Sequence, residues 1–150
     1  MSSELKNRID EEVKTAMRAR DRQRLGILRL VMAELKKVEV DERIELDDQR
    51  VLAILDRMVK QRKDSLTQFQ AAGRDDLVAQ ESFELDVLYS FLPARMTLTE
   101  LQKTVHTVIE ASGATSMKDM GKVMGQLKSI VQGRADMAEV GQMVKDTLGG

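Results

Sequence analysis

Apolar residues recur at intervals of three and four positions along most of the chain, the spacing that gathers them on one face of an α-helix. Seven such rows can be followed, over residues 5–17, 25–38, 52–69, 78–92, 101–109, 117–131 and 140–148. No alternation of apolar and polar residues marks a strand, and no segment repeats. The pattern predicts an all-α protein of seven helices.

Residues that favour helix ends stand at the limits of these rows. The expected N-cap or starting residues are Ser3, Asp21, Asp47, Asp75 or Asp76, Thr97, Ser116 and Asp136. After Thr97, Ser116 and Asp136, a Glu or Asp three positions on completes a capping-box pattern. Glycines at 73, 113 and 133 are expected to end helices. The acidic segment 39–48 has no regular apolar period and is expected to be an exposed connection.

The single proline divides the chain. Pro93 forces Leu92 out of the helical region and ends the fourth helix. Seven of the nine glycines follow it, so the composition changes at the same point. We therefore predict an N-terminal helical-hairpin domain of about four helices, residues 1–92, and a small three-helix tail domain, residues 97–150, with the boundary at Pro93.

Composition limits the class of protein. The chain has no cysteine, which excludes disulfides and thiolate metal sites, and a net charge of -1, so any attraction to nucleic acid must come from a local patch. Its longest apolar run, Val51 to Leu55, is far shorter than the roughly 20 residues that span a bilayer. We expect no membrane association and a cytoplasmic location.

The residues of ordinary catalytic sites are missing or isolated. His106 is the one histidine and has no second histidine with which to share a metal. Gly121-Lys122 lacks the preceding strand and the spaced glycine of a nucleotide-binding loop. We expect no catalytic residue, metal or cofactor.

Two groups of charged residues remain in the first 92 residues. Arg62 occupies an apolar-row position of the third helix, and in a hairpin that turns at Gly73 it lies near the level of Glu84 and one turn from Glu81. A structural ion pair of Arg62 with either glutamate is expected. Arginines at 18, 20, 22, 24 and 29 gather around the start of the second helix, where a solvated corner is the favoured interpretation.

The segment Asp119 to Gly125 is the most unusual. Gly121 and Gly125 stand four apart inside a predicted helix, where each costs roughly 1 kcal/mol relative to alanine. On a helical wheel they lie at the edge of the Met-rich stripe, with Lys118 and Lys122 just beyond. The glycines permit either close approach of another helix or contact with a ligand. The five methionines of the tail are either core residues or a pliable groove for a protein partner.

Several motifs in a fixed order resemble one known family. They are Lys14-Thr15-Ala16-Met17 with Leu28-Arg29, Lys60 to Ser65, Ala72-Gly73-Arg74, Tyr89 to Pro93, Asp119 to Gly125, and Gly133 to Asp136. Over its whole length the chain resembles the YqeY-like family of small bacterial proteins. The C-terminal part of that family is similar to the tail domain of the GatB subunit of tRNA-dependent amidotransferases.

The resemblance implies a role in holding tRNA, because the amidotransferase tail helps to hold tRNA while a separate cradle performs the chemistry. We therefore expect a non-catalytic module that binds tRNA or another structured RNA, associated with tRNA-dependent amidation or translation. Its expected RNA-binding residues are Lys118, Gly121, Lys122, Gly125, Lys128 and Arg134. The alternative is an accessory subunit that docks on a larger enzyme through the Met-rich tail. A carbon-nitrogen ligase that uses glutamine as amide donor follows from homology alone.

Overall fold

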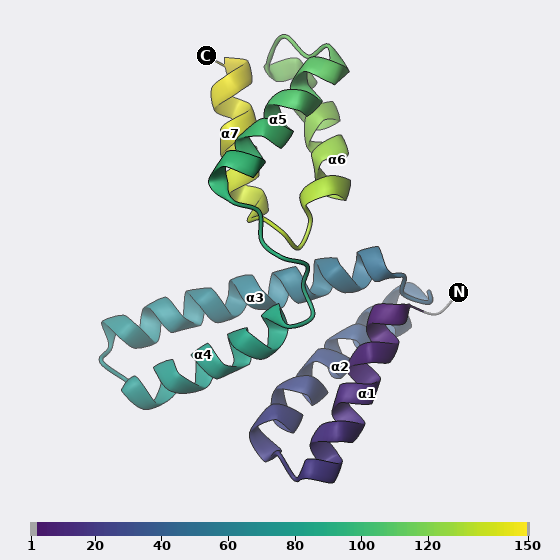
Figure 1. Ribbon diagram of the computed structural model, residues 1–150, viewed down its shortest axis with the longest axis vertical. Helices are drawn as coiled ribbons and strands as arrows, with labels where there is room; N and C mark the ends of the chain where they lie inside the picture. The colour runs from purple at the N-terminus through teal and green to yellow at the C-terminus, as the bar shows by residue number, and fades with distance from the viewer. Residues whose placement is uncertain (1–2, 150) are drawn as a thin grey trace. The chain divides into compact units, whose positions relative to one another are not determined.

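The computed structural model describes residues 3–149, and within them the chain forms only helices. Seven are α-helices: α1 (Glu4–Ala19), α2 (Arg22–Glu42), α3 (Asp48–Ala71), α4 (Asp75–Tyr89), α5 (Leu98–Ser112), α6 (Met120–Val131) and α7 (Met137–Gly149). A short 3-10 helix, η1 (Met117–Asp119), leads into α6 (Figure 1). The predicted all-α class is confirmed. The chain divides into two compact units, Met1–Leu92 and Pro93–Gly150, which are described separately below.

The helix ends follow from local hydrogen bonds. At the N-termini, the side chains of Asp21 and Thr97 accept from the backbone N–H groups of Arg24 and Glu100, at 3.1 Å each. Ser116 and Asp119 form the reciprocal capping box around η1. Gly113 closes α5 with a φ of 71°, a left-handed conformation that glycine adopts without steric cost.

Two local expectations are wrong. The acidic segment from Glu39 is helical as far as Glu42, because its charges have partners on neighbouring helices: Lys6 pairs with Glu39 at 2.8 Å, and Arg50 pairs with Glu42. The loop that follows is not wholly exposed, since Leu46 is completely buried. The row 117–131 is also not one continuous α-helix, because it begins with the 3-10 turn.

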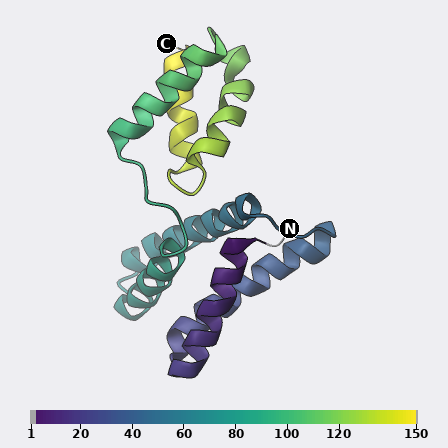
Figure 2. The same ribbon diagram turned by 45° about the vertical axis from the view of Figure 1, so that its right-hand side comes forward.

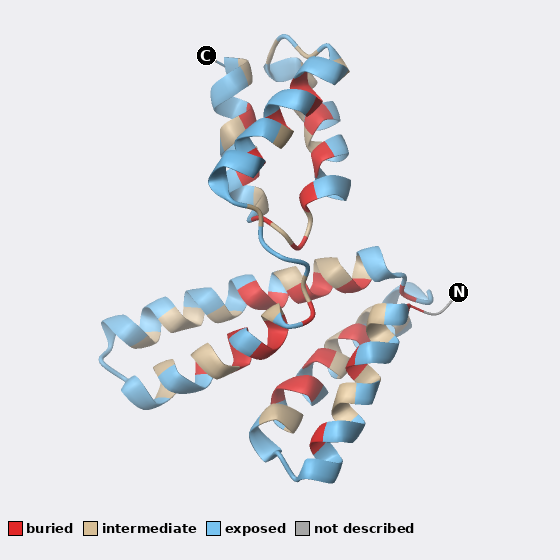
Figure 3. Ribbon diagram, viewed as in Figure 1, coloured by how far each residue is buried: buried red, intermediate tan, exposed pale blue. Residues whose placement is uncertain are grey.

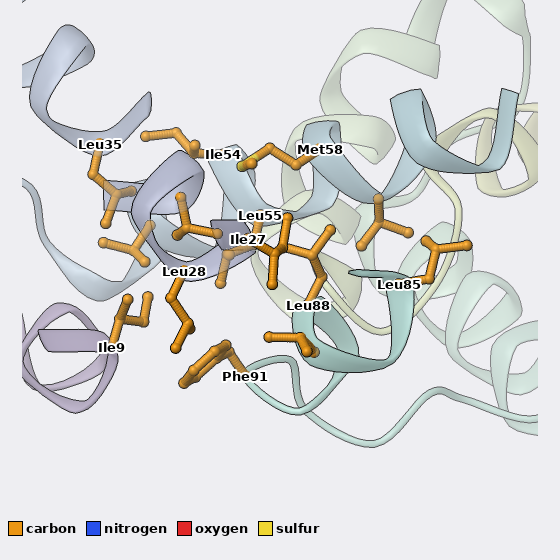
Figure 4. Packing of buried hydrophobic residues seen from close by; sticks show 14 of the residues in the cluster. Ile9, Ile27, Leu28, Leu35, Ile54, Leu55, Met58, Leu85, Leu88 and Phe91 are labelled. Atoms are coloured by element: carbon orange, nitrogen blue, oxygen red, sulfur yellow. The ribbon is translucent and has the colours of Figure 1, made fainter. Parts of the chain in front are cut away.

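The first unit consists of two helical hairpins. Helices α1 and α2 run antiparallel side by side, and so do α3 and α4 (Figures 1 and 2). Their facing sides bury one continuous apolar core, whereas the ends of α3 and α4 beside their connecting turn are exposed (Figure 3). All four helices contribute to this core, with Ile9 from α1, Leu28 from α2, Leu55 from α3 and Leu88 from α4 (Figure 4). Each such fully buried side chain contributes roughly 2 kcal/mol relative to leaving it exposed.

The second unit packs α5, α6 and α7 around a separate core. The side chains at its centre are completely buried: Val123, Leu127, Val131, Val140 and Val144. Val123 does not belong to the predicted apolar row, which runs through the methionines instead. Met120 and Met124 are only half-buried, so the true buried face of α6 is rotated toward the β-branched residues.

Asp48 connects the beginnings of α1 and α3. Its carboxylate accepts a hydrogen bond from the Ser3 hydroxyl and one from the Leu5 backbone N–H at 3.1 Å. The Ser3 hydrogen bond is the main cause that lowers the pKa of Asp48, with further contributions from the N–H groups of Leu5 and Glu4. Asp48 also lies in the first turn of α3, where its negative charge interacts favourably with the positive end of the helix dipole.

The pKa shift of Asp48 predicts a pH-dependent contribution to stability. Because the folded-state pKa lies below the ordinary value, the carboxylate stabilises the fold above about pH 4, and this contribution is lost as the pH falls through the lowered pKa. Asp48→Asn should therefore lower the free energy of unfolding at pH 7, by less than about 1 kcal/mol because the group is exposed. Urea titrations at pH 7 and pH 2.5 check this.

The matched control is Asp64→Asn, which removes an exposed carboxylate in the middle of α3, away from both helix ends. It should leave the difference from the parent the same at both pH values. An Asp48→Asn variant that remains equally destabilised at pH 2.5 and pH 7 would contradict the assigned role of the charge.

Candidate functional site

The glycine–lysine face is the exposed side of η1 and α6, defined here as Lys118, Gly121, Lys122, Gly125 and Lys128. All five residues are exposed, and they lie opposite the completely buried Val123, Leu127 and Val131. At 100° per residue, the five span about 120° of the helical wheel, with Gly125 near the middle. The arrangement therefore presents bare helical backbone framed by three cationic side chains.

The packing explanation for the two glycines does not hold. A Cβ atom added at Gly121 or Gly125 would meet nothing within 4 Å, so no helix of the described chain approaches either residue. Gly141 on α7 differs, because a Cβ there would lie 3.7 Å from Cε of Met124. The exposed glycines weaken α6 without any compensating contact inside the chain.

The three lysines of the face are not equivalent. The Lys122 ammonium donates to the carbonyl oxygen of Ser112, the last residue of α5, at 3.3 Å. A cation at a helix C-terminus stabilises that helix, so Lys122 has a structural role as well. For Lys118 and Lys128, the described part of the chain contains no ion-pair partner, which leaves both charges available to an anion.

Arg134 lies apart from the glycine–lysine face, in the turn between α6 and α7. Its Nε donates to the carbonyl oxygen of Ala94 at 2.9 Å, its Nη2 is 3.9 Å from a carboxylate oxygen of Glu100, and its own carbonyl accepts from the Met96 N–H at 2.9 Å. The guanidinium is therefore occupied in holding the segment before α5 against this turn. These contacts of Arg134 are with Ala94, Met96 and Glu100 and not with the glycine–lysine face.

The methionines of the tail act mainly as core residues. Met120, Met124, Met137 and Met143 pack against the buried cluster of the second unit. Met117 differs, with 40% of its surface exposed. Met143 and Met117 also line two separate surface pockets of this unit, so the alternative of a protein partner stays a prediction.

Arg62 lies between the two expected glutamates on α4. Its Nη1 is 2.9 Å from Oε2 of Glu84 and 3.5 Å from Oε1 of Glu81, and both glutamates are buried. The geometry allows a hydrogen bond to Glu81, whereas Oε2 of Glu84 accepts none from the described residues despite its short ionic contact. One cation therefore faces two buried carboxylates.

Other chemistry is sparse. His106 is exposed, and its Nε2 lies 3.0 Å from Oε1 of Glu110, one helical turn along α5. Among residues 3–149, no three His, Asp or Glu side chains gather closely enough to hold a metal ion. Over the same residues, every helix is too short or too polar to cross a membrane.

Sequence reasoning missed a groove between α2 and α4 in the first unit. Gly26, Ile27 and Leu30 of α2 line it, opposite Gln80 and Glu84 of α4. A signal was present in the sequence, because Gly26 stands inside the second predicted helix and Leu30 falls outside the predicted apolar row. Both features describe a helix face that is neither core nor ordinary polar surface.

The fold and the glycine–lysine face define a class: a small all-helical protein with a compact basic face on its second unit. The profile of the family described as "Yqey-like protein" matches residues 6–148. The chain therefore belongs to the YqeY-like family, as the sequence motifs predict.

Its relatives include fungal proteins named "Altered inheritance of mitochondria protein 41, mitochondrial". The protein from Pyrenophora tritici-repentis is 26% identical over 145 residues, which cover 95% of this chain and 80% of the relative. That from Vanderwaltozyma polyspora is 25% identical over 119 residues, 75% of this chain and 64% of the relative. The protein from Eremothecium gossypii is 32% identical over 87 residues, which cover 57% of this chain and 48% of the relative. The chain thus spans about half to four fifths of these relatives.

The open space at the two glycines predicts that alanine stabilises α6. Gly121→Ala and Gly125→Ala should each raise the free energy of unfolding by about 0.5–1 kcal/mol, because alanine loses less backbone entropy and has room for its Cβ. Urea titration measures the change. Gly113→Ala is the control and should destabilise, because its φ of 71° disfavours a side chain. A loss of stability in Gly121→Ala would show that the glycine has a structural partner.

The geometry of Arg62 predicts a large effect of its removal. Arg62→Met should lower the free energy of unfolding by roughly 2–3 kcal/mol, because two buried carboxylates lose their cation while Arg62 itself is 24% exposed. Urea titration of the double variant Arg62→Met/Glu84→Gln should recover part of the loss. If Arg62→Met is as stable as the parent, the ion pair has no structural role.

Proposed function

We propose that this chain is a non-catalytic RNA-binding module, with tRNA as the favoured ligand and the glycine–lysine face as the contact surface. The observation that carries the proposal is the pair of exposed glycines, Gly121 and Gly125, which no part of the described chain approaches. Natural helices rarely keep such positions without a reason, since each costs roughly 1 kcal/mol. Close approach of a ligand to the helix backbone supplies that reason.

The chemistry of the face suits a sugar-phosphate backbone. Glycine removes the side chains that would hold a nucleic-acid strand away from the helix, and Lys118, Lys122 and Lys128 place cations on both sides of the gap. Lysine acts on phosphate as a point charge and reads no sequence. Recognition of shape and charge is typical of proteins that bind folded RNA.

Arg134 has a supporting part in this proposal. Its guanidinium holds residues 94–96 beside the turn after α6, so it positions the beginning of α5 in the same unit as the glycine–lysine face. The predicted four-helix domain, residues 1–92, and three-helix domain, residues 97–150, belong to the proposal as separately folding parts. Cooperative unfolding of residues 93–150 expressed alone would support that division.

The fungal relatives carry the word "mitochondrial" in their names, whereas the sequence of this chain predicts a cytoplasmic location. A translation-related role for RNA binding is compatible with either compartment. Amide transfer from glutamine remains a separate hypothesis, which incubation of the chain with misacylated tRNA, glutamine and ATP would test. The accessory-subunit alternative rests on Met117 and Met143, which line two separate surface pockets of the second unit.

RNA binding is tested by electrophoretic mobility shift with total tRNA at 50 and 200 mM salt. Lys118→Glu/Lys128→Glu should weaken binding at least about tenfold and reduce the slope of log affinity against log salt by roughly 0.7–0.9 for each phosphate that the variant no longer neutralises. Gly121→Leu/Gly125→Leu should weaken it as well, by blocking the approach to the backbone, although it keeps every charge. Both variants leave the hydrogen bond of Lys122 intact.

The matched control is Lys103→Glu/Lys145→Glu, which makes the same charge change on exposed positions of α5 and α7. It should retain most of the parent's affinity. An equal decrease in affinity in the two charge variants would show general electrostatic attraction without a defined face. Absence of binding by the parent at 50 mM salt would refute the proposed function.

A further inference from the structure

The groove between α2 and α4 has a volume of about 600 Å³ and lies wholly within the first unit. Two of its lining residues are buried, Ile27 of α2 and Glu84 of α4, and they form its bottom. The other residues around it are exposed or half-buried: Arg22, Gln23, Gly26, Leu30, Asp76, Ala79 and Gln80. The groove thus has an apolar side and a carboxylate at the bottom.

Charge at the bottom of this groove is unbalanced. Glu84 and its neighbour Glu81 have side chains only 10% and 9% exposed, and both contact the single guanidinium of Arg62. Oε2 of each glutamate is buried and accepts no hydrogen bond from the residues described, although Oε2 of Glu84 lies 2.9 Å from Nη1 of Arg62. One cation thus faces two carboxylates, which leaves a net negative charge beside the groove. A buried carboxylate without a full set of partners is costly. The remaining negative charge points to a cationic ligand.

The rim does not supply that cation. Arg22 is exposed and makes no ion pair among the described residues, so water solvates its charge. Asp76 on the opposite side is already paired with Arg74, at 3.0 Å. Gln80 donates to Oε1 of Glu84 at 3.4 Å, a long hydrogen bond from an uncharged donor. The rim is mixed in sign and the bottom is acidic.

The apolar side of the groove restricts the ligand further. Leu30 is 47% exposed beside Ile27, and Gly26 leaves the wall open because a Cβ there would meet nothing within 4 Å. A ligand that satisfies both parts has an apolar stem with one cation at its end. Arginine has this form, and its weakly hydrated guanidinium is suited to pairing with carboxylates at interfaces.

We infer that the groove between α2 and α4 binds an arginine side chain of a partner polypeptide, with Glu84 as the anionic contact and Ile27 and Leu30 against the aliphatic stem. This site is independent of the glycine–lysine face and has the opposite charge preference. Because α2 and α4 belong to the unit before Pro93, the inference gives that unit a binding role of its own.

The test is a titration of the full-length protein, observed through its backbone amide signals by NMR, with n-butylguanidinium as the arginine mimic. Saturable shifts should appear at Gly26, Leu30 and Gln80, with a dissociation constant on the order of 1–10 mM. A blocked pentapeptide with one central arginine should bind at the same residues, and its counterpart with neutral, similarly shaped citrulline should not.

Two variants separate the contribution of the carboxylate charge from that of the open space in the groove. Glu84→Gln should weaken n-butylguanidinium binding at least about tenfold, and it keeps the Arg62–Glu81 pair, so the urea midpoint should be unchanged or higher. Gly26→Leu should abolish binding by filling the groove and leaves both glutamates intact. Ala138→Leu, at an exposed position of α7 outside the groove, is the control and should bind like the parent.

Other outcomes overturn the inference. Unchanged binding in Gly26→Leu would place the cation elsewhere. Tighter binding of spermidine than of n-butylguanidinium would indicate a free polyamine as ligand, and shifts of the same amides by inorganic phosphate would make Arg22 the binding group. Absence of saturable shifts with n-butylguanidinium and the arginine peptide would leave the groove without this function.

Discussion

A single guanidinium between two buried carboxylates constrains the first unit more than any other interaction. Arg62 takes a position on α3 that the apolar row would give to a leucine, and it fixes that level of α3 opposite Glu81 and Glu84 on α4. Such pairs add more to register than to net stability, because desolvation offsets much of the attraction. The same arrangement leaves negative charge uncompensated beside the α2–α4 groove, so the register of the hairpin and the chemistry of the groove share one origin.

The second unit contains a helix, α6, that is less stable than its packing would allow. Its core is an ordinary one of valines and leucines, but the opposite face of α6 contains two glycines where alanine would be more stable. Nothing in the fold requires them: their backbone is helical and their surroundings are open. Glycines that weaken a helix without a structural role are best explained by a function of the surface. Here the two glycines leave the helix backbone accessible between lysine side chains.

Most of the fold could be predicted from local chemistry, because caps and glycine stops act over three or four residues. Asp21, Thr97 and Gly113 fix helix ends by hydrogen bonds that the sequence already implies. The Arg62 pairing was also predictable, since a hairpin turning at Gly73 sets the register. The missed features depend on distant partners: the helical state of Glu39 to Glu42 rests on Lys6 and Arg50, and the occupation of Arg134 rests on Ala94.

The glycine–lysine face shows how structure separates two interpretations that sequence leaves equal. Spacing alone cannot distinguish a glycine that lets a helix approach from one that faces solvent, because both lie at the edge of an apolar stripe. The empty space at Gly121 and Gly125 decides against internal packing, whereas the same measure at Gly141 finds Met124. Gly26 beside the α2–α4 groove is open in the same way, and it adjoins a buried glutamate, Glu84, that shares one guanidinium with Glu81. At Gly26 in the first unit, and at Gly121 and Gly125 in the second, an open glycine inside a helix lies beside charge that the described residues do not fully balance.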